Sequence, residues 1–473
     1  MSERKQFRAV KGTRDILPPD SALWNRFEQT AREIFASYNF AEIRLPIFEE
    51  TELFARSIGA ETDVVSKEMF SFYDPFDPAK ISEYIVTQFA GGGSHLPEPA
   101  AAEGIAIRSG RDAATLGLGV PFEKITLRPE ATASVCRAYI EHGMHTRPGN
   151  VKLYYIGPMF RRERPQKGRH RQFYQIGAEV LGQSDAPAID AELIEMLLAF
   201  FGRVGLTSTT LYINSIGDQN CRPQYVELLR AELRKVKDKL GADSQRRIET
   251  NPLRVLDSKV PDEQAVIETL PRIADHLCDA CREHFAKLKD ELRLREIAFE
   301  ENWRLVRGLD YYTRTTFEVT AAGLGSQNAV CGGGRYDGLV ELLGGPPTKG
   351  IGFAIGSDRT ILSIQESGNV PDLRGLSVYV AWMGEKVHPA AVSVAKKLRD
   401  CGLSVELPAE EMKFKKSLGL ADKLRARYAL IIGEDEVASA TYTLKRLADG
   451  DQRKLSENDL LEYLESEMRG RSG

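Results

Sequence analysis

Apolar and polar positions recur along the chain with two different periods, which predict both helices and strands. Positions 20–38 repeat apolar residues at helical spacing and predict an amphipathic helix. The next apolar run, 41–48, predicts a strand, and its Pro46 favours a strand end or a sheet edge. Further strands are predicted at 125–128, 153–156, 173–181, 210–213, 317–320 and 350–355. Because helices separate these hairpin-spaced strands, we predict an α+β fold around a largely antiparallel sheet.

Two segments interrupt this pattern. Positions 222–302 are highly charged and periodic at helical spacing, which predicts an inserted helical subdomain. Within it, 270–293 has the pattern of one continuous helix. Positions 84–122 contain GGGSHLPEPAAAEG and many small residues, which is typical of a flexible insertion.

From position 376 onward, strands alternate with helices. The predicted elements are strand 377–382, helix 388–400, strand 404–407, helix 413–427, strand 428–433, and a last strand and helix after position 440. This order predicts a separate α/β domain with a mainly parallel or mixed sheet. A linker containing glycine and proline is expected near 362–375, so we assign 1–370 to the first domain and 371–473 to the second.

The composition indicates several globular domains and only local attraction for polyanions. A length of 473 residues predicts about two to four domains. A net charge of −4 argues against a surface that is basic throughout. The N-terminal residues lack a signal-peptide pattern and no run of about 18 apolar residues occurs, so we expect a cytoplasmic protein without a membrane span. The six cysteines show no disulfide framework, which fits a reducing compartment.

One pair of cysteines has the spacing of metal ligands. Cys278 and Cys281 are flanked by His276 and His284, a set of side chains that could hold zinc. The segment follows a helical pattern, however, and no second cysteine pair of this spacing is present. We therefore expect packing on a helix face, no metal site and no zinc.

The most informative motif is a cationic loop between two predicted strands. The loop carries Arg161, Arg162, Arg164, Lys167, Arg169 and Arg171. Guanidinium groups present forked donors that suit phosphate oxygens, so a polyphosphate is the expected ligand. The alternative is a solvated loop whose charges serve solubility. Glu163 and Pro165 interrupt the run, and this favours a site. The alternation of Phe173, Gln175 and Glu179 on the returning strand favours it too.

Four further motifs carry candidate chemistry. In LRPEAT, Glu130 could cap the following helix or face a cationic ligand. In LVRGLDYY, Arg307 is clustered with two phenols, and the alternative is an ion pair with Asp310. The glycines of CGGGRYDG indicate a tight turn or a close approach to a ligand. GIGFAIGSDR places Arg359 at the start of a helix, where its guanidinium could also bind phosphate. The glycine-rich loops of common nucleotide-binding folds are missing from the sequence.

Together these motifs resemble the histidyl-tRNA synthetase family of class II aminoacyl-tRNA synthetases over nearly the whole chain. FRRERPQKGRHRQFYQIGAE is similar to the family's motif 2, GIGFAIGSDR to motif 3, and EIRLPIFE to the motif 1 strand of the dimer interface. LRPEAT, LVRGLDYY and GGRYDGL resemble histidine-specific elements. The departures are Ala131 in place of the usual glycine, Asp358 where glutamate is common, and the insertion at 84–122.

The resemblance implies a histidine–tRNA ligase, which activates L-histidine with ATP, releases pyrophosphate and transfers the acyl group to the 3′ end of tRNA(His). By resemblance, Arg161 and Arg307 hold the α-phosphate and the substrate carboxylate and are the catalytic pair. ATP is expected to contact Arg161, Arg169, Phe173 and Arg359, with Phe173 stacked on adenine. The expected histidine pocket is Glu130, Ala131, Thr132, Gln175, Glu179, Arg307, Tyr311 and Tyr312. Arg164 and Gln166 are expected to meet the tRNA acceptor end.

Within that pocket, the resemblance implies different residues for the imidazole and for the α-amino group of histidine. Glu130 and Tyr312 are the expected partners of the imidazole. Gln175, Glu179 and Thr132 are expected to bind the α-amino group, because their oxygens match an ammonium's donors.

The resemblance also implies partners. Mg²⁺ is expected with ATP, and motif 1 implies a homodimer. The second domain is expected to bind the anticodon. Its basic residues are either a solvated face or a nucleic-acid contact: Lys413, Lys415, Lys416, Lys423, Arg425 and Arg427. Two alternatives stay open, namely a catalytically inactive, synthetase-like regulatory subunit of histidine biosynthesis and a class II synthetase for another amino acid.

Overall fold

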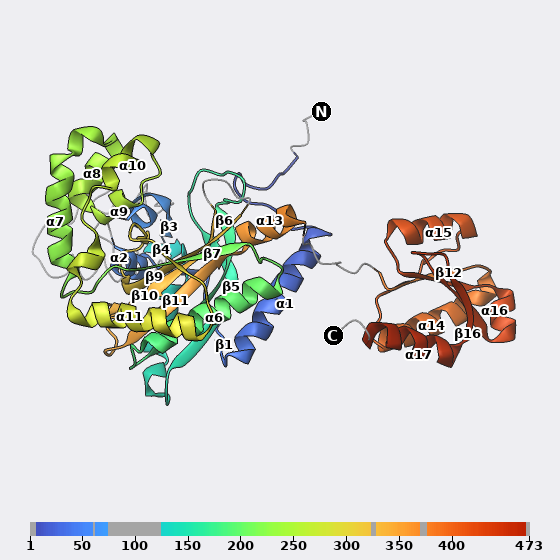
Figure 1. Ribbon diagram of the computed structural model, residues 1–473. Helices are drawn as coiled ribbons and strands as arrows, with labels where there is room; N and C mark the ends of the chain where they lie inside the picture. The colour runs from blue at the N-terminus through green and yellow to red at the C-terminus, as the bar shows by residue number, and fades with distance from the viewer. Residues whose placement is uncertain (1–5, 60–61, 74–123, 323–327, 369–375, 470–473) are drawn as a thin grey trace, which may run out of the picture. The chain divides into compact units, whose positions relative to one another are not determined.

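The computed structural model describes residues 6–59, 62–73, 124–322, 328–368 and 376–469 (Figure 1). The insertion predicted at 84–122 therefore lies outside the described residues. The chain divides into two compact units, Met1–Pro371 and Asp372–Gly473. In the described part of the chain, no helix combines the length and apolarity needed to cross a membrane.

An eight-stranded sheet forms the centre of the first unit. In spatial order its strands are β1 (Ala41–Glu42), β5 (Val151–Phe160), β6 (Gln172–Gly182), β11 (Lys349–Gly356), β10 (Ala329–Arg335), β9 (Thr313–Ala321), β7 (Thr209–Ser215) and β8 (Glu300–Glu301). All pairings from β5 across to β7 are antiparallel, and only the edge strands β1 and β8 join in parallel. The predicted antiparallel core of an α+β fold is thus confirmed.

Long helices cover one face of this sheet. They are α1 (Asp20–Ser37), α6 (Pro187–Arg203) and α13 (Ser357–Ser367), and Figure 1 shows α1 beside α6. The buried side of α1 recurs at helical spacing, which is why the helix predicted at 20–38 is confirmed. Phe27 of α1 meets Phe200 of α6 with ring centroids 5.0 Å apart, and Phe35 meets Tyr154 of β5 at 4.7 Å. These aromatic contacts fasten the helices to the sheet.

The opposite face of the sheet carries a second hydrophobic cluster. Leu153 and Tyr155 belong to it, whereas Tyr154 faces α1, as expected when successive side chains of a strand alternate. The elements on this side are α5 (Thr132–Glu141), α2 (Thr51–Ile58), α12 (Leu339–Leu342), a π-helical turn (Val64–Glu68) and a small antiparallel sheet of β2 (Phe48–Glu50), β4 (Lys124–Leu127) and β3 (Phe70–Tyr73).

The single strand predicted over 41–48 is wrong. The segment forms β1 and β2, which belong to different sheets, and 43–47 between them is not strand. Pro46 has no N–H to donate to a sheet ladder. The carbonyl oxygens of Leu45 and Pro46 instead accept hydrogen bonds from Nη1 of the buried Arg128, at 2.9 and 3.1 Å. A guanidinium therefore occupies the place of a neighbouring strand.

The glycine run at 332–334 lies inside β10, a central strand that the periodicity did not predict. The close approach expected from these glycines is present, but the neighbours belong to the protein itself. A Cβ added at Gly332 would overlap the guanidinium of Arg307, and one added at Gly333 would overlap the carbonyl oxygen of Gly352 on β11. Because glycine has no side chain, the guanidinium of Arg307 can lie directly against this strand.

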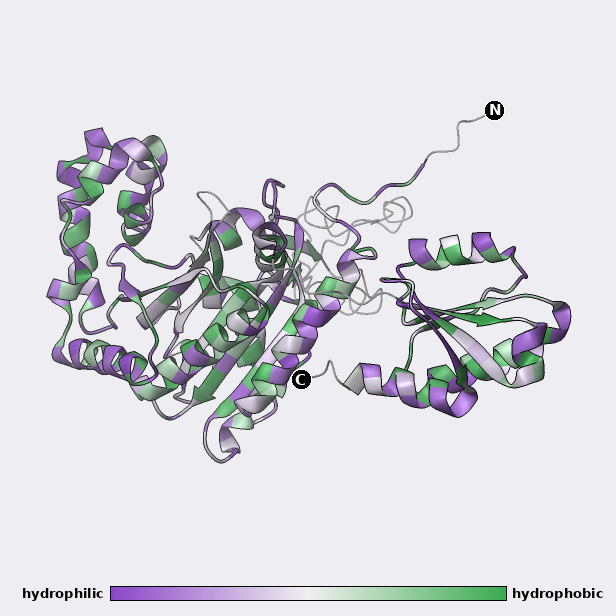
Figure 2. Cartoon of the chain, turned by 45° about the vertical axis from the view of Figure 1, so that its right-hand side comes forward, coloured by the Kyte–Doolittle hydropathy of each residue, from purple (hydrophilic) through white to green (hydrophobic). Residues whose placement is uncertain are grey.

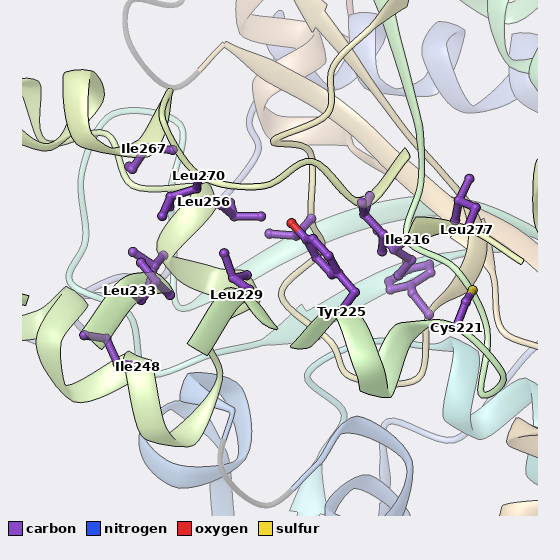
Figure 3. Packing of buried hydrophobic residues seen from close by; sticks show 14 of the residues in the cluster. Ile216, Cys221, Tyr225, Leu229, Leu233, Ile248, Leu256, Ile267, Leu270 and Leu277 are labelled. Carbon is purple, nitrogen blue, oxygen red and sulfur yellow. The ribbon is translucent and has the colours of Figure 1, made fainter. Parts of the chain in front are cut away.

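The segment predicted as a helical insertion forms a group of helices that share an apolar core. It consists of α7 (Arg222–Lys235), α8 (Ala242–Thr250), α9 (Leu253–Leu256), α10 (Pro261–Ile267) and α11 (Asp279–Leu294). Figure 3 shows Leu229 and Leu233 of α7 turned toward Leu256, Ile267 and Leu270. The continuous helix predicted at 270–293 is wrong, because a 3₁₀ turn (Ile273–His276) ends before Leu277 and α11 begins only after Cys278.

The second unit is built on a mixed sheet, as predicted. Its strands in spatial order are β13 (Val405–Glu406), β12 (Val378–Trp382), β14 (Tyr428–Ile432), β15 (Thr441–Arg446) and β16 (Gln452–Ser456), the first three parallel and the last two antiparallel. Its helices are α14 (His388–Asp400), α15 (Phe414–Lys423), α16 (Glu434–Ser439) and α17 (Glu457–Arg469). Figure 2 shows apolar residues concentrated in the strands and polar residues on the outer sides of the helices.

Three boundaries in this region differ from expectation. The helix predicted at 413–427 ends at Lys423, and Arg425 beyond it has φ of 53°, a left-handed conformation that a helix cannot contain. The linker predicted from position 362 begins later, because α13 continues to Ser367. Two strands rather than one precede the last helix, since β15 and β16 form a hairpin.

Candidate active site

A cavity of about 340 Å³ lies over the centre of the large sheet. Its walls come from β6, β9, β10 and β11, from the cationic loop 161–171 and from residues 307–312 on the return from the helical insertion. The predicted site residues that line it are Glu130, Thr132, Arg161, Arg169, Phe173, Gln175, Arg307, Tyr311, Tyr312 and Arg359. The predicted residues that do not line it are Ala131, Glu179, Arg164 and Gln166.

Glu130 holds the start of α5. Its Oε2 accepts a hydrogen bond from the backbone N–H of Thr132 at 2.8 Å, and its Oε1 accepts one from that of Ala133 at 2.9 Å. The predicted capping role is therefore confirmed, while the same carboxylate also faces the cavity. Burial raises the pKa of Glu130, and the two backbone hydrogen bonds act in the opposite direction. Ala131, between the acid and the helix, is fully buried.

Glu179 on β6 lies beneath the cavity and supports two of its lining residues. Its carboxylate accepts hydrogen bonds from the hydroxyl of Tyr336 at 2.6 Å and that of Thr132 at 2.7 Å. Gly352 leaves room for this carboxylate, because a Cβ at that position would overlap it. Burial raises the pKa of Glu179 to about 8. Glu179 therefore reaches the cavity through two hydroxyl groups.

Arg307 lies at the side of the cavity formed by β9 and β10. Its Nη1 donates to Oε2 of Glu318 at 2.8 Å, and its guanidinium lies over Gly332. The alternative ion pair with Asp310 is wrong, because Asp310 accepts from the side-chain amide of Asn251 at 3.0 Å and Arg307 faces the sheet. Its guanidinium is thus fixed next to the cavity.

Two buried polar atoms of the lining have no hydrogen-bond partner among the described residues. They are Oε1 of Gln175, an acceptor, and Nε of Arg307, a donor. An unpaired buried polar group costs roughly 1–3 kcal/mol, so these two atoms at the cavity are available for hydrogen bonds to a ligand. A ligand that carries both an ammonium and a carboxylate satisfies the pair. An α-amino acid has these two groups.

Two tyrosines complete this end of the cavity. The hydroxyl of Tyr311 lies 3.4 Å from Oε2 of Glu130, and the rings of Tyr311 and Tyr312 lie 4.7 Å apart. Burial raises the pKa of Tyr312 to about 12, so its hydroxyl stays protonated. The end near Glu130 therefore presents both hydrogen-bond donors and an acidic acceptor.

Another part of the cavity lining is cationic. Nε of Arg161 donates to the carbonyl oxygen of Pro129 at 3.0 Å, and its guanidinium lies 5.3 Å from the centre of the Phe173 ring. Nη1 of Arg359 donates to the carbonyl oxygen of Ala329 at 3.1 Å. Burial, and then the positive charge of Arg169, lower the pKa of Arg359, which shows how closely the cations converge.

The cationic loop itself is a tight turn. Gln166 and Arg169 exchange two backbone hydrogen bonds, at 2.9 and 3.2 Å, and Gly168 between them has φ of 71°. Nη1 of Arg169 lies 3.2 Å from a carboxylate oxygen of Glu163. Arg164 and Gln166 are exposed on this loop and lie outside the cavity lining. Charges of the loop are thus divided between the cavity and the outer surface.

Several lining residues were missed by the sequence-based predictions. Tyr155, Glu318, Tyr336 and His170 all line the cavity. Glu318 had a detectable signal, since it is a lone acid within the apolar strand 317–320. Tyr336 belongs to a motif whose glycines alone were weighed. Tyr155 had no such signal, because an aromatic residue in a strand is usually core.

Two family models match the chain in sequence. A histidyl-tRNA synthetase model matches residues 122–359 and an anticodon-binding domain model matches residues 377–467. The histidine–tRNA ligase of Koribacter versatilis (strain Ellin345) is 49% identical over 470 residues, 98% of each chain. That of Solibacter usitatus (strain Ellin6076) is 49% identical over 460 residues, 97% of this chain and 99% of the relative.

A solved structure matches as well. The crystal structure of apo S. aureus histidyl-tRNA synthetase superposes with a TM-score of 0.73 at 33% identity, covering 97% of this chain and 100% of the other. The antiparallel sheet, the arginine-lined cavity and the following mixed-sheet unit thus define a class II aminoacyl-tRNA synthetase with an anticodon-binding domain.

Within that class, the chain belongs to the histidyl-tRNA synthetase family. The predicted function, a histidine–tRNA ligase, is confirmed by relatives that share nearly half of the residues over almost the full length. The regulatory alternative is less supported, because these relatives are named as ligases.

Proposed function

We propose that this cavity performs the histidine–tRNA ligase reaction with the residues that line it. The carboxylate of L-histidine attacks the α-phosphorus of ATP, the bond to the β-phosphate oxygen breaks, and pyrophosphate leaves. The acyl group of the adenylate then passes to the 3′-terminal ribose of tRNA(His), with AMP as leaving group. The observation that carries this proposal is the unpaired acceptor of Gln175 and donor of Arg307 beside a cluster of arginines.

The histidine substrate is oriented by its three polar groups. Oε1 of Gln175 and the hydroxyl of Thr132, which Glu179 holds in place, receive the ammonium. Nε of Arg307 donates to the carboxylate. The imidazole lies toward Glu130 and Tyr312, which offer an acceptor and a hydroxyl. A histidine isostere without ring N–H groups would lose its hydrogen bond to Glu130, and this discriminates against it.

ATP is held at the cationic part of the cavity lining. Arg161 contacts the α-phosphate, Arg169 and Arg359 the outer phosphates, and Phe173 the adenine ring. Because the reaction moves negative charge rather than using a protein nucleophile, fixed guanidinium groups supply most of the stabilisation. Mg²⁺ bound to the phosphates would add positive charge there. Glu163 and Glu318 are oxygen donors of the type this ion prefers, and both line the cavity.

The remaining partners are proposed from the family. Arg164 and Gln166, exposed on the cationic loop, contact the acceptor end of the tRNA, and the second unit contacts its anticodon. The enzyme is a homodimer whose interface includes the motif 1 segment. Ile47 and Phe48 of that segment are 46% and 52% exposed in the single chain, as apolar residues at an interface would be. We assign it to the cytoplasm.

The test is amino-acid-dependent exchange of labelled pyrophosphate into ATP, run with each of the twenty amino acids. Exchange with histidine alone is the expected result, because adenylate formation needs both parts of the cavity. Exchange with another amino acid would overturn the pocket assignment. No exchange from folded protein that still binds histidine would favour the regulatory alternative.

A further inference from the structure

Three thiols and one carboxylate meet at the base of the helical insertion, apart from the cavity. The side chains are Asp218, Cys221, Cys278 and Cys281, and their ligand atoms all lie within 4.8 Å of one another. Asp218 and Cys221 precede α7, whereas Cys278 precedes α11 and Cys281 lies in its first turn, so the cluster joins segments about sixty positions apart. We propose that this cluster is a structural zinc site with three thiolate ligands and one carboxylate ligand.

The spacing of the ligand atoms matches a tetrahedral metal. Sγ of Cys221 lies 3.8 Å from Sγ of Cys281 and 3.7 Å from Oδ1 of Asp218, and Sγ of Cys278 lies 3.8 Å from the same oxygen. With zinc–sulfur bonds of about 2.3 Å, the edge of a tetrahedron is about 3.8 Å. A disulfide needs sulfur atoms about 2.05 Å apart, so Cys221 and Cys281 are not bonded to each other.

The chemistry of the ligands also selects zinc. Thiolates are soft ligands, and a four-ligand set dominated by sulfur in tetrahedral positions suits Zn²⁺ rather than Mg²⁺ or Ca²⁺. The ligand set differs from the one weighed in the sequence, because His276 stacks near Tyr225 and His284 contacts the carbonyl oxygen of Asp185. Asp218 and Cys221, far away in the sequence, take the positions of the two histidines. The expectation that no zinc is bound considered the two histidines and not Asp218 and Cys221.

The surroundings stabilise a negatively charged centre. Cys221 and Cys278 are the N-cap residues of α7 and α11, so the positive ends of two long helices face the cluster. The carboxylate of Asp218 is oriented by the backbone N–H of Asn220 at 2.9 Å and lies 3.5 Å from the guanidinium of Arg314. Such contacts around a metal site hold its ligands in position.

The local backbone is shaped around these side chains. A Cβ at Gly217, whose φ is 67°, would approach Sγ of Cys221 to 2.8 Å, so only glycine fits next to this sulfur. Cys221 and Cys281 are buried together with Leu277 in the apolar core of the insertion, where Figure 3 shows Cys221 and Leu277 side by side. Cys278 is half-buried, which leaves a route by which the metal can enter.

The role of the metal is mechanical and is independent of the reaction mechanism proposed above. It closes the base of the insertion, from which the chain returns to Arg307 and Tyr312 of the cavity. Arg222, the neighbour of Cys221, donates a hydrogen bond to the carbonyl oxygen of Tyr312. Loss of zinc should therefore lower the thermal stability of the enzyme and raise KM for histidine more than KM for ATP.

The test measures metal content in the full chain, purified without a chelator or a metal-binding tag. Wild type should contain about one zinc per chain. The zinc content of Cys278→Ser and of Cys281→Ser should be lower by roughly tenfold or more. Cys401→Ser, at the half-buried end of α14 in the other unit, is the matched control and should retain it. Because Cys278 is half-buried, its replacement by serine leaves the apolar core intact.

A second measurement does not depend on the folding of variants. Wild type stripped of metal under reducing conditions should take up Co²⁺ and show the visible bands of a tetrahedral, thiolate-ligated ion, which Zn²⁺ should abolish. The proposal is overturned if reduced wild type binds neither ion, or if Cys278→Ser and Cys281→Ser keep the wild-type zinc content. A disulfide between Cys221 and Cys281 in freshly isolated protein would overturn it as well.

Discussion

Arg307 is held by contacts on two sides of its guanidinium. Glu318 accepts from Nη1, and the glycines of β10 allow the group to lie flat against the sheet. Its Nε is left for a ligand. A side chain fixed in this way stabilises charge that develops during the reaction without having to reorganise.

Replacing Arg307 by alanine should lower kcat for pyrophosphate exchange by about 10²–10³-fold while changing KM for ATP little, because the outer phosphates keep Arg169 and Arg359. Steady-state exchange kinetics at varied ATP and histidine check this. Arg293→Ala, which removes an exposed arginine paired with Asp290 on α11, is the control. An unchanged adenylation rate in Arg307→Ala would refute the assignment.

Glu130 caps α5 and faces the cavity, and two measurements on one variant test these two roles separately. In Glu130→Ala, KM for histidine should rise roughly 10–100-fold with KM for ATP nearly constant, since a buried partner of the imidazole is lost. The same change should cost about 1–2 kcal/mol of unfolding free energy, because α5 loses its N-terminal acceptor. Glu141→Ala, at the other end of α5, controls for general effects on the helix. Equal losses for ATP and histidine would count against the assignment.

The raised pKa of Glu179 predicts that the stability of the fold depends on pH. Its pKa rises from 4.5 to about 8 in the folded state because burial disfavours the charged form. A carboxyl group with a raised pKa stabilises the fold below its unfolded pKa, and this contribution is lost as pH increases toward the folded value. Between pH 5 and pH 8, the unfolding free energy of ligand-free wild type should therefore fall by roughly 1–4 kcal/mol relative to Glu179→Gln.

Denaturant unfolding of both proteins across this pH range measures the difference. Glu130, whose pKa is also raised, is present in both proteins; its charge helps to raise the pKa of Glu179, so the difference between the two profiles includes this coupling. Parallel pH profiles for the two proteins would show that Glu179 titrates normally.

At the scale of elements, β10 is a strand whose missing side chains create the space for the site. Gly332→Ala should reduce kcat at least tenfold, because the new methyl group displaces the guanidinium of Arg307. Gly419→Ala is the control: this glycine lies in α15, a Cβ there meets no neighbouring atom within 4 Å, and the change should raise stability by about 0.5–1 kcal/mol. Thermal melts of both variants separate loss of activity from loss of fold. Wild-type exchange activity in Gly332→Ala would contradict the proposed steric role.

Elements with an uninterrupted period were predictable, and those shaped by distant side chains were not. The apolar positions of α1 and α14 recur regularly, so their bounds agree with prediction within one residue. The segment 41–48 is apolar enough for a strand, but Arg128, about eighty positions away, takes its carbonyl oxygens. No local pattern contains that information.

In the candidate site, too, some residues could be predicted from local sequence and others could not. Residues in dense motifs, such as Arg161 and Arg307, were found from sequence and line one cavity. The depth of Glu179 could not be inferred, because its burial depends on glycine at position 352 of another strand. The cysteine cluster was also hidden, since it joins the beginnings of two helices that are distant in the chain.

At the scale of the whole molecule, the first compact unit contains the cavity, and the second matches an anticodon-binding domain. The helix α15 presents the exposed Lys415 and Lys416. A double replacement, Lys415→Ala with Lys416→Ala, should raise KM for tRNA about 3–30-fold and weaken its salt dependence, because two phosphate contacts are lost. Pyrophosphate exchange should not change, since it needs no tRNA.

The control for this double variant is Lys396→Ala on α14, which removes a lysine paired with Asp400. Aminoacylation at several tRNA and salt concentrations distinguishes the two faces of the unit. An unchanged KM for tRNA would assign the basic helix to a solvated surface.

The helical insertion begins and ends beside the same pair of strands, and near its end the short strand β8 adds to the edge of the sheet. Ile216 donates to the carbonyl oxygen of Arg314, and Arg314 donates to that of Gly217, next to the pairing of Ser215 with Thr315. The insertion, together with β8, thus connects the two antiparallel strands β7 and β9 in the way that a long hairpin loop would. Lengthening a flexible loop from ten to a hundred residues costs only about 2 kcal/mol of closure entropy. Changes of length in the outer helices should therefore alter the closure entropy little, whereas the return segment that carries Arg307 and Tyr312 must keep its length to reach the cavity.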